Sequence, residues 1–402
     1  MSTTVTIGGV RYEGWKSVSM SRSIESAASS FSFSSTLRWP GDPNPLRARP
    51  GDQVVIMDDG DEALTGYIDV DGISTDEETE AVNIPGRSKT GDLIDSSACY
   101  VDPAQYGDMD AQVHLPREFN GMTPLSIMTA LAAPFGVNVE YVIMGLTVND
   151  PMYIPIQSYS AMPGERAFEA IERLARTMSV LVTDNAQGDL VLIRFDEFST
   201  NNPFGAKVPI IKVGGADGNA KIADGLFSFE QRYSHVIVRG QRPGTASDSG
   251  ATVSSQLGRA RDPEVLRRRV LIVDADEPSS IAQLNARAAW EAATRAGRGV
   301  SVTYEMEGWR WGDGSQKEPG QLVRVIDPPR GIDATMLLVT AGWSEDSEEK
   351  QSTVTLAPPG GYEMLAPEKR QASGRKAITN GDDYNVWLTA EQVRTIKREA
   401  GQ

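Results

Sequence analysis

The chain has 402 residues, of which 40% are hydrophobic, and its 39 basic and 55 acidic residues give a net charge of −16. This length accommodates two to four domains. The acidic surplus argues against a protein that reads DNA sequence, because such proteins present a basic face to the phosphates. The single cysteine, Cys99, excludes an intrachain disulfide. We expect it to be a small buried residue of a protein that folds in a reducing cytoplasm. Neither a signal peptide nor a membrane-spanning stretch is evident, so we expect a soluble protein.

Residues 1–90 have the composition of β-structure. Short strands are expected at 5–9 and 12–15, and a long two-stranded ribbon at 17–36, where Phe31 and Phe33 alternate with serines. Serine is a modest strand former, so we expect this ribbon to need a neighbour that stabilises it.

Residues 91–205 change character and predict a small α/β domain. A helix is expected at 123–132, with Thr123 as its N-cap, Pro124 at its first position and Gly136 just after its end. A second helix is expected at 163–178, where apolar residues recur at helical spacing. A hairpin with strands at 179–183 and 190–193 follows.

Residues 206–360 return to β-structure with one helix, and residues 361–402 lose apolar density. The expected elements of this part are strands at 227–230 and 235–240, a Ser/Gly/Thr-rich loop at 245–258, a helix at 280–296 and a strand at 300–304. The polar tail ends in a short helix whose capping box begins at Thr389.

One pattern of residues occurs twice in the chain. Pro50-Gly51 opens an apolar strand that is followed by a second strand ending near Gly72, an acidic run and a third strand at 82–85. Pro319-Gly320 opens the same succession, with Gly342 and residues 354–357 in the matching places. The spacing is 22 positions from Pro50 to Gly72 and 23 from Pro319 to Gly342. A duplicated β-module favours a symmetric assembly over a single catalytic site.

Motifs of catalysis or metal binding are not supported. The acidic runs 58–62 and 76–78 lack the spacing of a calcium loop, and we interpret them as solvated hairpin tips. His114 and His235 do not form a zinc motif, and His235 is expected to be a structural residue of a strand. Residues 86–91 resemble half of a phosphate-binding loop, but Asp92 stands where lysine is needed. We therefore predict no cofactor, no metal and no enzyme, although sequence spacing does not exclude a pair of acids that meet only in the fold.

Several segments together carry a family resemblance; they are residues 8–15, 86–98, 163–175, 184–192 and 319–356. In this order they resemble the baseplate hub protein of Mu-like contractile-tailed phages, a family similar to the hub part of type VI secretion spike proteins. The resemblance implies a mainly β fold with an α+β insertion, built of two similar tube-like β-barrel domains and a small α/β domain. The implied divisions are 1–90 for the first barrel, 91–205 for the α/β domain, 206–360 for the second barrel with one helix, and 361–402 for the tail.

The resemblance also implies a structural function. Three chains would form a homotrimeric ring of six barrel modules that adapts the threefold tail spike to the sixfold tail tube and lets DNA pass through its centre. The implied partners are the spike, the tube and other baseplate proteins, in a virion assembled in the host cytoplasm. Phe31 and Phe33 are then candidates for the subunit interface, with the alternative that they fill the core of their own barrel. The C-terminal tail is a candidate for spike binding, with a disordered tail as the alternative.

Two other classes of protein compete with the hub. The first is a tail-associated cell-wall or polysaccharide hydrolase, which requires an acidic pair in a cleft. The second is a cell-surface adhesion module, which usually carries the secretion signal that we do not find here.

Overall fold

The structure is a computed structural model of the chain. It describes residues 3–12, 15–35, 48–70, 72–75, 80–98, 100–101, 113–114, 118–144, 150–162, 164–178, 180–195, 208–240, 256–275 and 281–362. The predictions for Cys99, the acidic run 76–78, the loop segment 245–255 and the helix near Thr389 concern residues outside these ranges.

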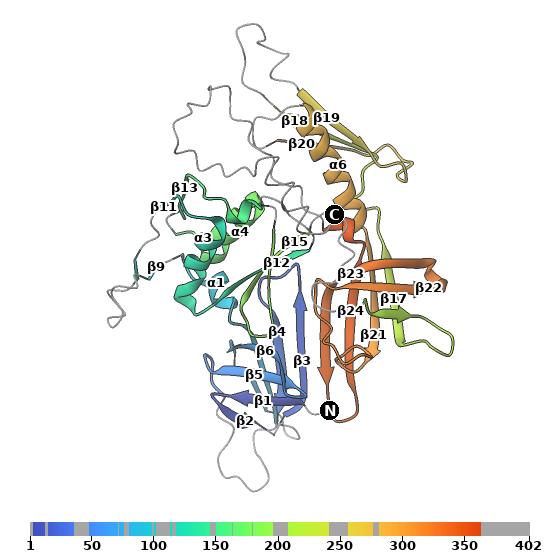
Figure 1. The fold of residues 1–402 in the computed structure, drawn as a ribbon. Coiled ribbons are helices and arrows are strands. Elements are labelled where there is room, and N and C mark those ends of the chain that lie inside the picture. Colours follow the sequence, from blue (N-terminus) through green and yellow to red (C-terminus); the bar gives the residue numbers. More distant parts are fainter. Residues whose placement is uncertain are drawn as a thin grey trace, which may run out of the picture.

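A 14-stranded sheet dominates the described part, so the predicted mainly β fold is confirmed. Its first half consists of β1 (Thr3–Ile7), β2 (Val10–Tyr12), β3 (Trp15–Ser23), β4 (Ser30–Ser35), β5 (Gln53–Asp58), β6 (Asp61–Ile68), β7 (Gly72–Thr75) and β8 (Glu80–Ser88). Its second half consists of β16 (Ile210–Lys212), β17 (Ala220–Phe227), β21 (Val300–Glu307), β22 (Leu322–Asp327), β23 (Ile332–Glu345) and β24 (Lys350–Ala357). The two halves lie side by side in Figure 1, where the first is blue and β21 to β24 of the second are orange, and they meet where β3 pairs with β23.

The two halves share one strand order, and we call them the first and second module. The first runs β3-β4-β8-β6-β5-β1, and the second runs β17-β21-β24-β23-β22-β16. Along the chain, too, the corresponding strands follow one another in the same sequence. They differ in one pairing, because β1 is antiparallel to β5 whereas β16 is parallel to β22.

The turn before the second strand pair is built alike in both modules. Gly51 and Gly320 both have φ of 92°. The amide of Gly51 donates to Ile68 O at 2.8 Å, and the amide of Gly320 donates to Leu338 O at 2.7 Å. The predicted repeat therefore corresponds to one local structure that occurs twice.

The strand register changes which residues of the two repeats correspond to each other. Gly72 pairs with Asn83, and Gly342 pairs with Thr353, so eleven positions separate the partners in each hairpin. The residue that corresponds to Val354 is consequently Ile84, and not Val82 as the sequence pattern indicated. The extra residue before Gly342 comes from the turn between the first two strands of the repeat. Four residues, 328–331, separate β22 from β23, whereas two separate β5 from β6, and a bulge in the β5–β6 pair makes up one of these two.

The α/β segment stands beside the first module (teal and green in Figure 1). Its main elements are α1 (Gly91–Asp95), α3 (Pro124–Ala132), α4 (Ala167–Met178), β12 (Val139–Met144), β14 (Leu181–Asp184) and β15 (Leu190–Phe195). The short elements are β9 (Tyr100–Val101), β10 (Val113–His114), β11 (Phe119–Asn120), β13 (Ser158–Tyr159) and the 3-10 turns η2 (Ala133–Phe135) and η3 (Pro151–Tyr153). Thr123 caps α3 by accepting from the Ser126 amide, as predicted, whereas α4 begins four residues later than expected.

The second module carries an insertion between β17 and β21 (gold in Figure 1). It comprises β18 (His235–Gly240), β19 (Gln256–Arg261), β20 (Val270–Asp274) and α6 (Ile281–Arg298), with η4 (Pro328–Arg330) and η5 (Pro359–Gly361) later in the chain. The helix and the strand with His235 are confirmed. The strand expected at 227–230 is wrong, because β17 ends at Phe227.

The insertion and the α/β segment each have apolar cores apart from the main sheet. Leu284 and Ala288 of α6 pack on Val236 and Val238 of β18. Leu93 of α1 belongs to the core formed by the helices and the three-stranded sheet of the α/β segment. A small cluster around Ile24 joins β15 to the second module at Leu337.

Substituting alanine for Gly51 is expected to destabilise the protein by about 1–2 kcal/mol, because an L-residue is strained at positive φ. The effect should arise from the backbone alone, since a Cβ at Gly51 would meet nothing within 4 Å. Urea denaturation of Gly51→Ala measures it. Gly312→Ala is the matched control, because Gly312 has equally open surroundings without the positive φ, and its midpoint should stay within error of the parent. Equal midpoints for the two variants would contradict the prediction.

Candidate assembly site at the seam between the two modules

The seam is an antiparallel pairing of β3 with β23. Six residue pairs connect the strands, from Thr340 with Ser23 to Glu345 with Val18. At one end the Ile24 amide donates to Val339 O at 2.9 Å. Because β3 is the outermost strand of the first module and β23 belongs to the second, this ladder joins the two modules into one sheet.

The apolar residues beneath the seam form one core. Val18 and Met20 of β3 and Ala341 and Trp343 of β23 are buried in a cluster that reaches from Val5 to Leu356. A core that draws on both modules stabilises their relative placement, because separating them would expose these side chains to water.

Phe31 and Phe33, the residues proposed from sequence as subunit contacts, lie in this shared core. They are 3% and 1% exposed, and their rings stack with centroids 6.3 Å apart. The strand that carries them has β3 on one side and β8 on the other. Their burial agrees with the alternative that they fill the core, and a role at a subunit interface stays a prediction.

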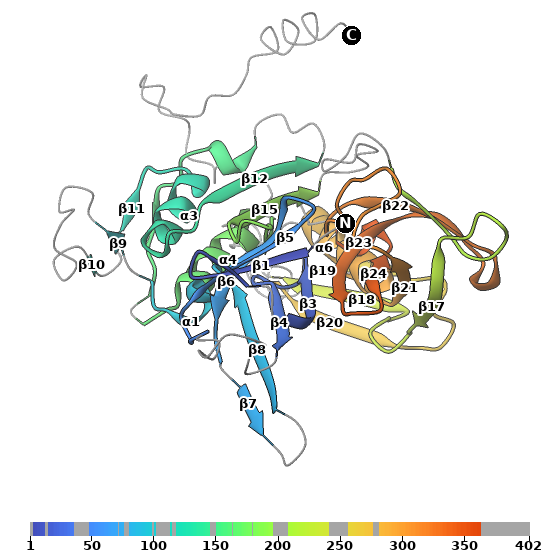
Figure 2. The same ribbon diagram turned by 90° about the horizontal axis from the view of Figure 1, so that it is seen from below.

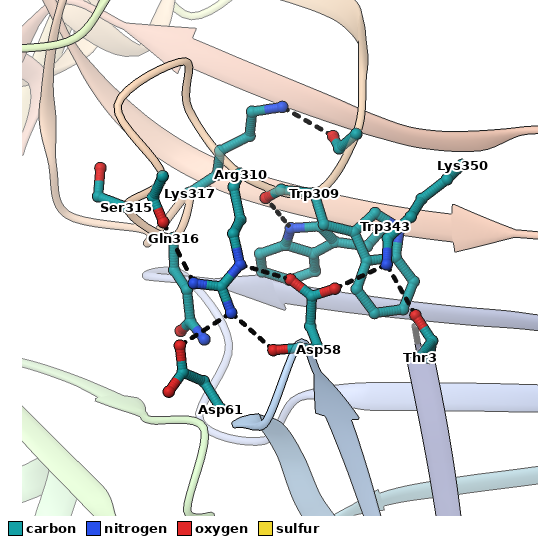
Figure 3. A network of polar contacts seen from close by, with 12 residues as sticks. Thr3, Asp58, Asp61, Trp309, Arg310, Ser315, Gln316, Lys317, Trp343 and Lys350 are labelled. Atoms are coloured by element: carbon teal, nitrogen blue, oxygen red, sulfur yellow. Dashed lines mark hydrogen bonds and ion pairs between the residues drawn. The ribbon is translucent and has the colours of Figure 1, made fainter. Parts of the chain in front are cut away.

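A buried carboxylate ties the two modules together at the end of β5 (Figure 3). Asp58 Oδ2 accepts from Arg310 Nε at 2.8 Å, and Asp58 Oδ1 accepts from Lys350 Nζ at 2.6 Å. The Asp58 side chain is 4% exposed and both cations are 16% exposed. Since Asp58 belongs to the first module and both cations to the second, the network is an ionic bond across the seam.

Neighbouring groups complete the hydrogen bonding of this network. Arg310 Nη2 donates to the Asp58 carbonyl at 2.6 Å and to Asp61 Oδ2 at 2.9 Å. Lys350 Nζ donates to Thr3 Oγ1 at 2.8 Å and lies 4.4 Å from the ring centroid of Trp309. Satisfied donors of this kind reduce the cost of burying charge.

The acidic run 58–62 is the hairpin tip that the sequence predicts, since Asp59 and Gly60 form the turn between β5 and β6. The expectation of solvated charge is wrong for Asp58. The second module covers that end of the hairpin. A local sequence pattern could not predict this, because Arg310 and Lys350 lie far away in the sequence.

A second charged contact across the seam packs against Trp343. Arg22 of β3 is 3% exposed, donates to Ala63 O at 2.6 Å and pairs with Glu318. Its guanidinium carbon lies 5.5 Å from the Trp343 ring centroid. Arg22 thus links β3, β6 and the segment before β22.

A buried lysine anchors the segment between β21 and β22 that carries Arg310. Lys317 has no exposed surface, and its Nζ donates to Gly308 O at 2.8 Å and to Ser352 Oγ at 2.6 Å. Burial lowers the pKa of Lys317 to about 8. This lysine fixes the position of the arginine at the seam.

The ribbon tip is held by the α/β segment. Asp184 accepts from the Ser29 amide at 2.8 Å and from Ser29 Oγ at 2.6 Å. Burial raises the pKa of the Asp184 carboxyl. Thr183 donates to Ser23 O at 2.9 Å, so the serine-rich ribbon has the neighbour that its weak strand propensity calls for.

Within the described ranges, no group of three or more His, Cys, Asp and Glu side chains is arranged to hold a metal ion. In the same residues, no helix combines the length and apolar character needed to span a membrane. His235 lies in β18, where its Nδ1 is 3.0 Å from Ser234 Oγ. The seam is built of strand pairing, apolar burial and ion pairs.

Three family models match consecutive parts of the chain. They are the N-terminal domain of the Mu phage baseplate assembly protein GpP-like family at residues 2–88, the second domain of the baseplate hub protein gp44-like family at residues 90–194, and the fourth domain of the Mu phage baseplate assembly protein GpP at residues 280–365. The baseplate hub protein gp44 of Escherichia phage Mu is 29% identical over 404 residues, covering 97% of this chain and 95% of that protein. The chain belongs to the Mu-like baseplate hub family.

Solved structures agree with this membership. The 43 kDa tail protein of prophage MuSo2 from Shewanella oneidensis superposes with a TM-score of 0.72 at 26% identity, covering 91% of this chain and all of that one. A tail protein from Neisseria meningitidis has the same fold, with a TM-score of 0.68 at 20% identity and coverages of 90% and 97%. The fold of the Mu-like hub family thus extends over the described modules and insertions.

Removing the Asp58 charge from this hub-family chain is expected to destabilise it by about 1.5–3 kcal/mol, because Arg310 and Lys350 would each lose a buried charged acceptor and keep only their ion pairs with Asp61 and Glu345. Urea denaturation of Asp58→Asn measures the loss. Asp61→Asn is the control: its carboxylate bonds the same arginine but is 64% exposed, so it should cost less than about 1 kcal/mol. Similar losses for both variants would show that burial of Asp58 does not set the strength of the network.

Lys317 is expected to make the stability of the chain rise with pH above about 8. The unfolded chain keeps its lysine proton to a higher pH than the folded chain does, so over this interval the unfolded state binds more protons. Below pH 8 the cost of the buried charge is fully present. The measurement compares free energies of unfolding for the parent and Lys317→Met at pH 7, 8, 9 and 10. Above pH 8 the free energy of unfolding of the parent should rise relative to that of the variant by about 1 kcal/mol per pH unit. A difference that does not change with pH would contradict the lowered pKa of Lys317.

Proposed function

We propose that the chain is the structural hub of a contractile-tail baseplate and that three copies form a ring of six β-modules. A structural tail protein of a Mu-like phage is the function that the family membership supports directly. The ring adapts the threefold spike to the sixfold tail tube, and its central opening lets DNA pass during ejection. The protein then resides in the virion tail after assembly in the host cytoplasm.

One observation supports the ring above all: two modules with the same strand order are joined edge to edge within one chain. In the seam the first module contributes β3 and the second contributes β23. These are different edges of like modules, so the contact is heterologous, and repeated heterologous contacts produce rings or filaments. Three chains with two modules each supply the six positions that match the symmetry of a tail tube.

The charge of the chain suits a passage for DNA. A net charge of −16 repels a phosphate backbone and keeps it from adhering, provided that acidic side chains line the opening. DNA would then move through the ring without sequence-specific contacts. The spike, the tube and other baseplate proteins are the proposed protein partners.

We also propose that the sequence divisions 1–90, 91–205 and 206–360 act as the parts of the hub, the first and third as tube-like barrels. The matched family models at 2–88 and 90–194 support the first border, and the equivalent strand orders support the likeness of the barrels. The tail 361–402 is the proposed contact for the spike. A pulldown of the spike by a chain truncated after Gly361 tests this contact.

The competing hydrolase class makes a different prediction. It requires lytic activity on peptidoglycan or polysaccharide, and this activity should be lost when one acid of a cleft is substituted. The named relatives of the chain are structural tail and baseplate proteins, which favours a passive ring. A zymogram with the purified chain should therefore show no clearing.

Solution mass tests the ring. The chain has a mass of 43.5 kDa, and sedimentation equilibrium over a range of concentrations should detect a species of three times that mass. Negative-stain images of this species should show a central opening with six density maxima around it. A monomer at every concentration, or a dimer that does not grow further, would contradict the proposed assembly.

A further inference from the structure

Four strands of the sheet have one partner only in the described part of the chain, and two of them are β2, which pairs with β1, and β16, which pairs with β22. β17 pairs there with β21 alone, and β7 pairs there with β8 alone. The Ser228 amide donates toward β21, to Gly299 O at 2.7 Å. Because hydrogen-bonding direction alternates along a strand, the backbone groups of Ala223, Gly225 and Phe227 point toward the open edge. Open edges of this kind are templates for pairing with another chain.

β17 occupies in the second module the place that β3 occupies in the first. Both are the outermost strands of the matching orders. Both also carry a bulge at the same position, between Trp15 and Ser17 in β3 and between Ala220 and Ile222 in β17. The shared irregularity aligns the two strands residue by residue, so that Ser19 corresponds to Asp224 and Ser21 to Leu226.

β7 occupies in the first module the place of the second half of β23. Gly72 and Gly342 lie at equivalent positions of equivalent hairpins, opposite Asn83 and Thr353. In the seam, this half of β23 receives β3, with Gly342 opposite Ser21 and Ser344 opposite Ser19. The first module therefore presents, at β7, the kind of edge that binds β3 within the chain.

Building on the proposed ring, we propose that β17 of one copy pairs antiparallel with β7 of the next copy and repeats the internal seam between subunits. Transferring the seam register places Gly72 opposite Leu226, Ser74 opposite Asp224 and Thr75 opposite Ala223. The partner is thus a second copy of this chain, recognised by main-chain hydrogen bonds as in other cases of strand addition.

The side chains of β17 support a covered edge. Ile222, Leu226 and Phe227 are 53%, 65% and 52% exposed, whereas Arg22, the residue of β3 that corresponds to Phe227 and is covered by β23, is 3% exposed. Several large apolar side chains on one open strand are typical of a surface that is buried by a partner. The contact would remove them from water at the subunit boundary.

The open edges of β7 and β17 lie far apart in the molecule. Figure 2 shows β7 projecting at the bottom of the view and β17 at the right. One chain therefore does not pair its own two edges, and each copy offers one edge of each kind. A head-to-tail contact of this kind closes when the rotation per module returns to its start.

Arg330 marks one end of the proposed pairing. Its guanidinium donates to the carbonyl of Ala223 and to Asp327 Oδ2, the latter at 3.1 Å. This carbonyl belongs to the open edge, so an arginine already satisfies it within the chain. Pairing with β7 then extends from this point toward Phe227, which agrees with the short length of β7.

Cysteine cross-linking tests the contact and its register. Ser74→Cys is combined in turn with Ile222→Cys, Asp224→Cys or Leu226→Cys, each in a Cys99→Ser chain. Ser74 and Asp224 correspond to a non-hydrogen-bonded pair of the seam, where Cα atoms are about 4.5 Å apart and a disulfide fits. Oxidation should give covalent dimers and trimers on non-reducing gels, formed several-fold faster with Asp224→Cys than with the other two.

The internal seam supplies the matched control. Ser19→Cys with Ser344→Cys occupies the equivalent pair within one chain and should form its disulfide without changing the mass of the chain. Ser74→Cys with Ala220→Cys is the negative control, because four residues further along the strand add about 13 Å.

The outcomes separate this proposal from the ring itself. Fastest cross-linking at Ile222→Cys or Leu226→Cys overturns the register. Trimers in sedimentation that none of the three pairs cross-links overturn the β17–β7 contact and leave the ring standing. A chain that is monomeric in sedimentation and forms no cross-linked species overturns the proposed function together with the contact.

Discussion

The pairing of β3 with β23 is the interaction on which the rest of the structure depends. It joins strands more than 300 positions apart in sequence and turns two modules into one sheet with one core. Contacts of such long range close large loops, and the entropic cost of this closure must be offset by favourable interactions. The buried Asp58 network and the apolar residues beneath the seam provide these interactions. They also fix how the two modules sit relative to each other, on which any ring would depend.

The two modules are alike in topology but differ in how they treat corresponding groups. Asp58 and Asp327 end equivalent strands. Asp58 bonds cations of the other module, whereas Asp327 accepts from Tyr304 Oη at 3.0 Å and pairs with Arg330, both in its own module. The carboxylate that connects modules in one place thus stabilises a single module in the other.

Much of the local structure follows from the sequence, because local rules govern it. A proline–glycine pair in front of an apolar strand revealed the repeat, and both glycines have the positive φ that only glycine adopts without strain. Thr123 and Pro124 fixed the start of α3 by satisfying or removing free amides of the first turn. In these cases the determining contacts lie within a few residues of the signal.

The seam could not be predicted, because its determinants are far apart in sequence. Asp58 stands in a run of acids that looks solvated, and only the fold brings Arg310 and Lys350 to it. β17 was misplaced for a related reason: its burial does not alternate as it does in β3, since one side of the strand has no partner within the described chain. A strand that is exposed on both faces lacks the alternating pattern by which strands are recognised.

This asymmetry bears on how a ring of such chains would assemble. The contact inside the chain combines strand pairing, a shared core and a buried ion network. The equivalent contact between copies would have strand pairing and the apolar side chains of β17. It would lack the ion network, because Asp327 already pairs with Arg330 of its own module. Six equal modules would make six equal contacts, but duplicated modules in one chain make strong and weaker contacts alternate. In the proposed ring the strong contacts would form during folding, and only the weaker ones would depend on concentration and on the partners that a threefold spike would bring together.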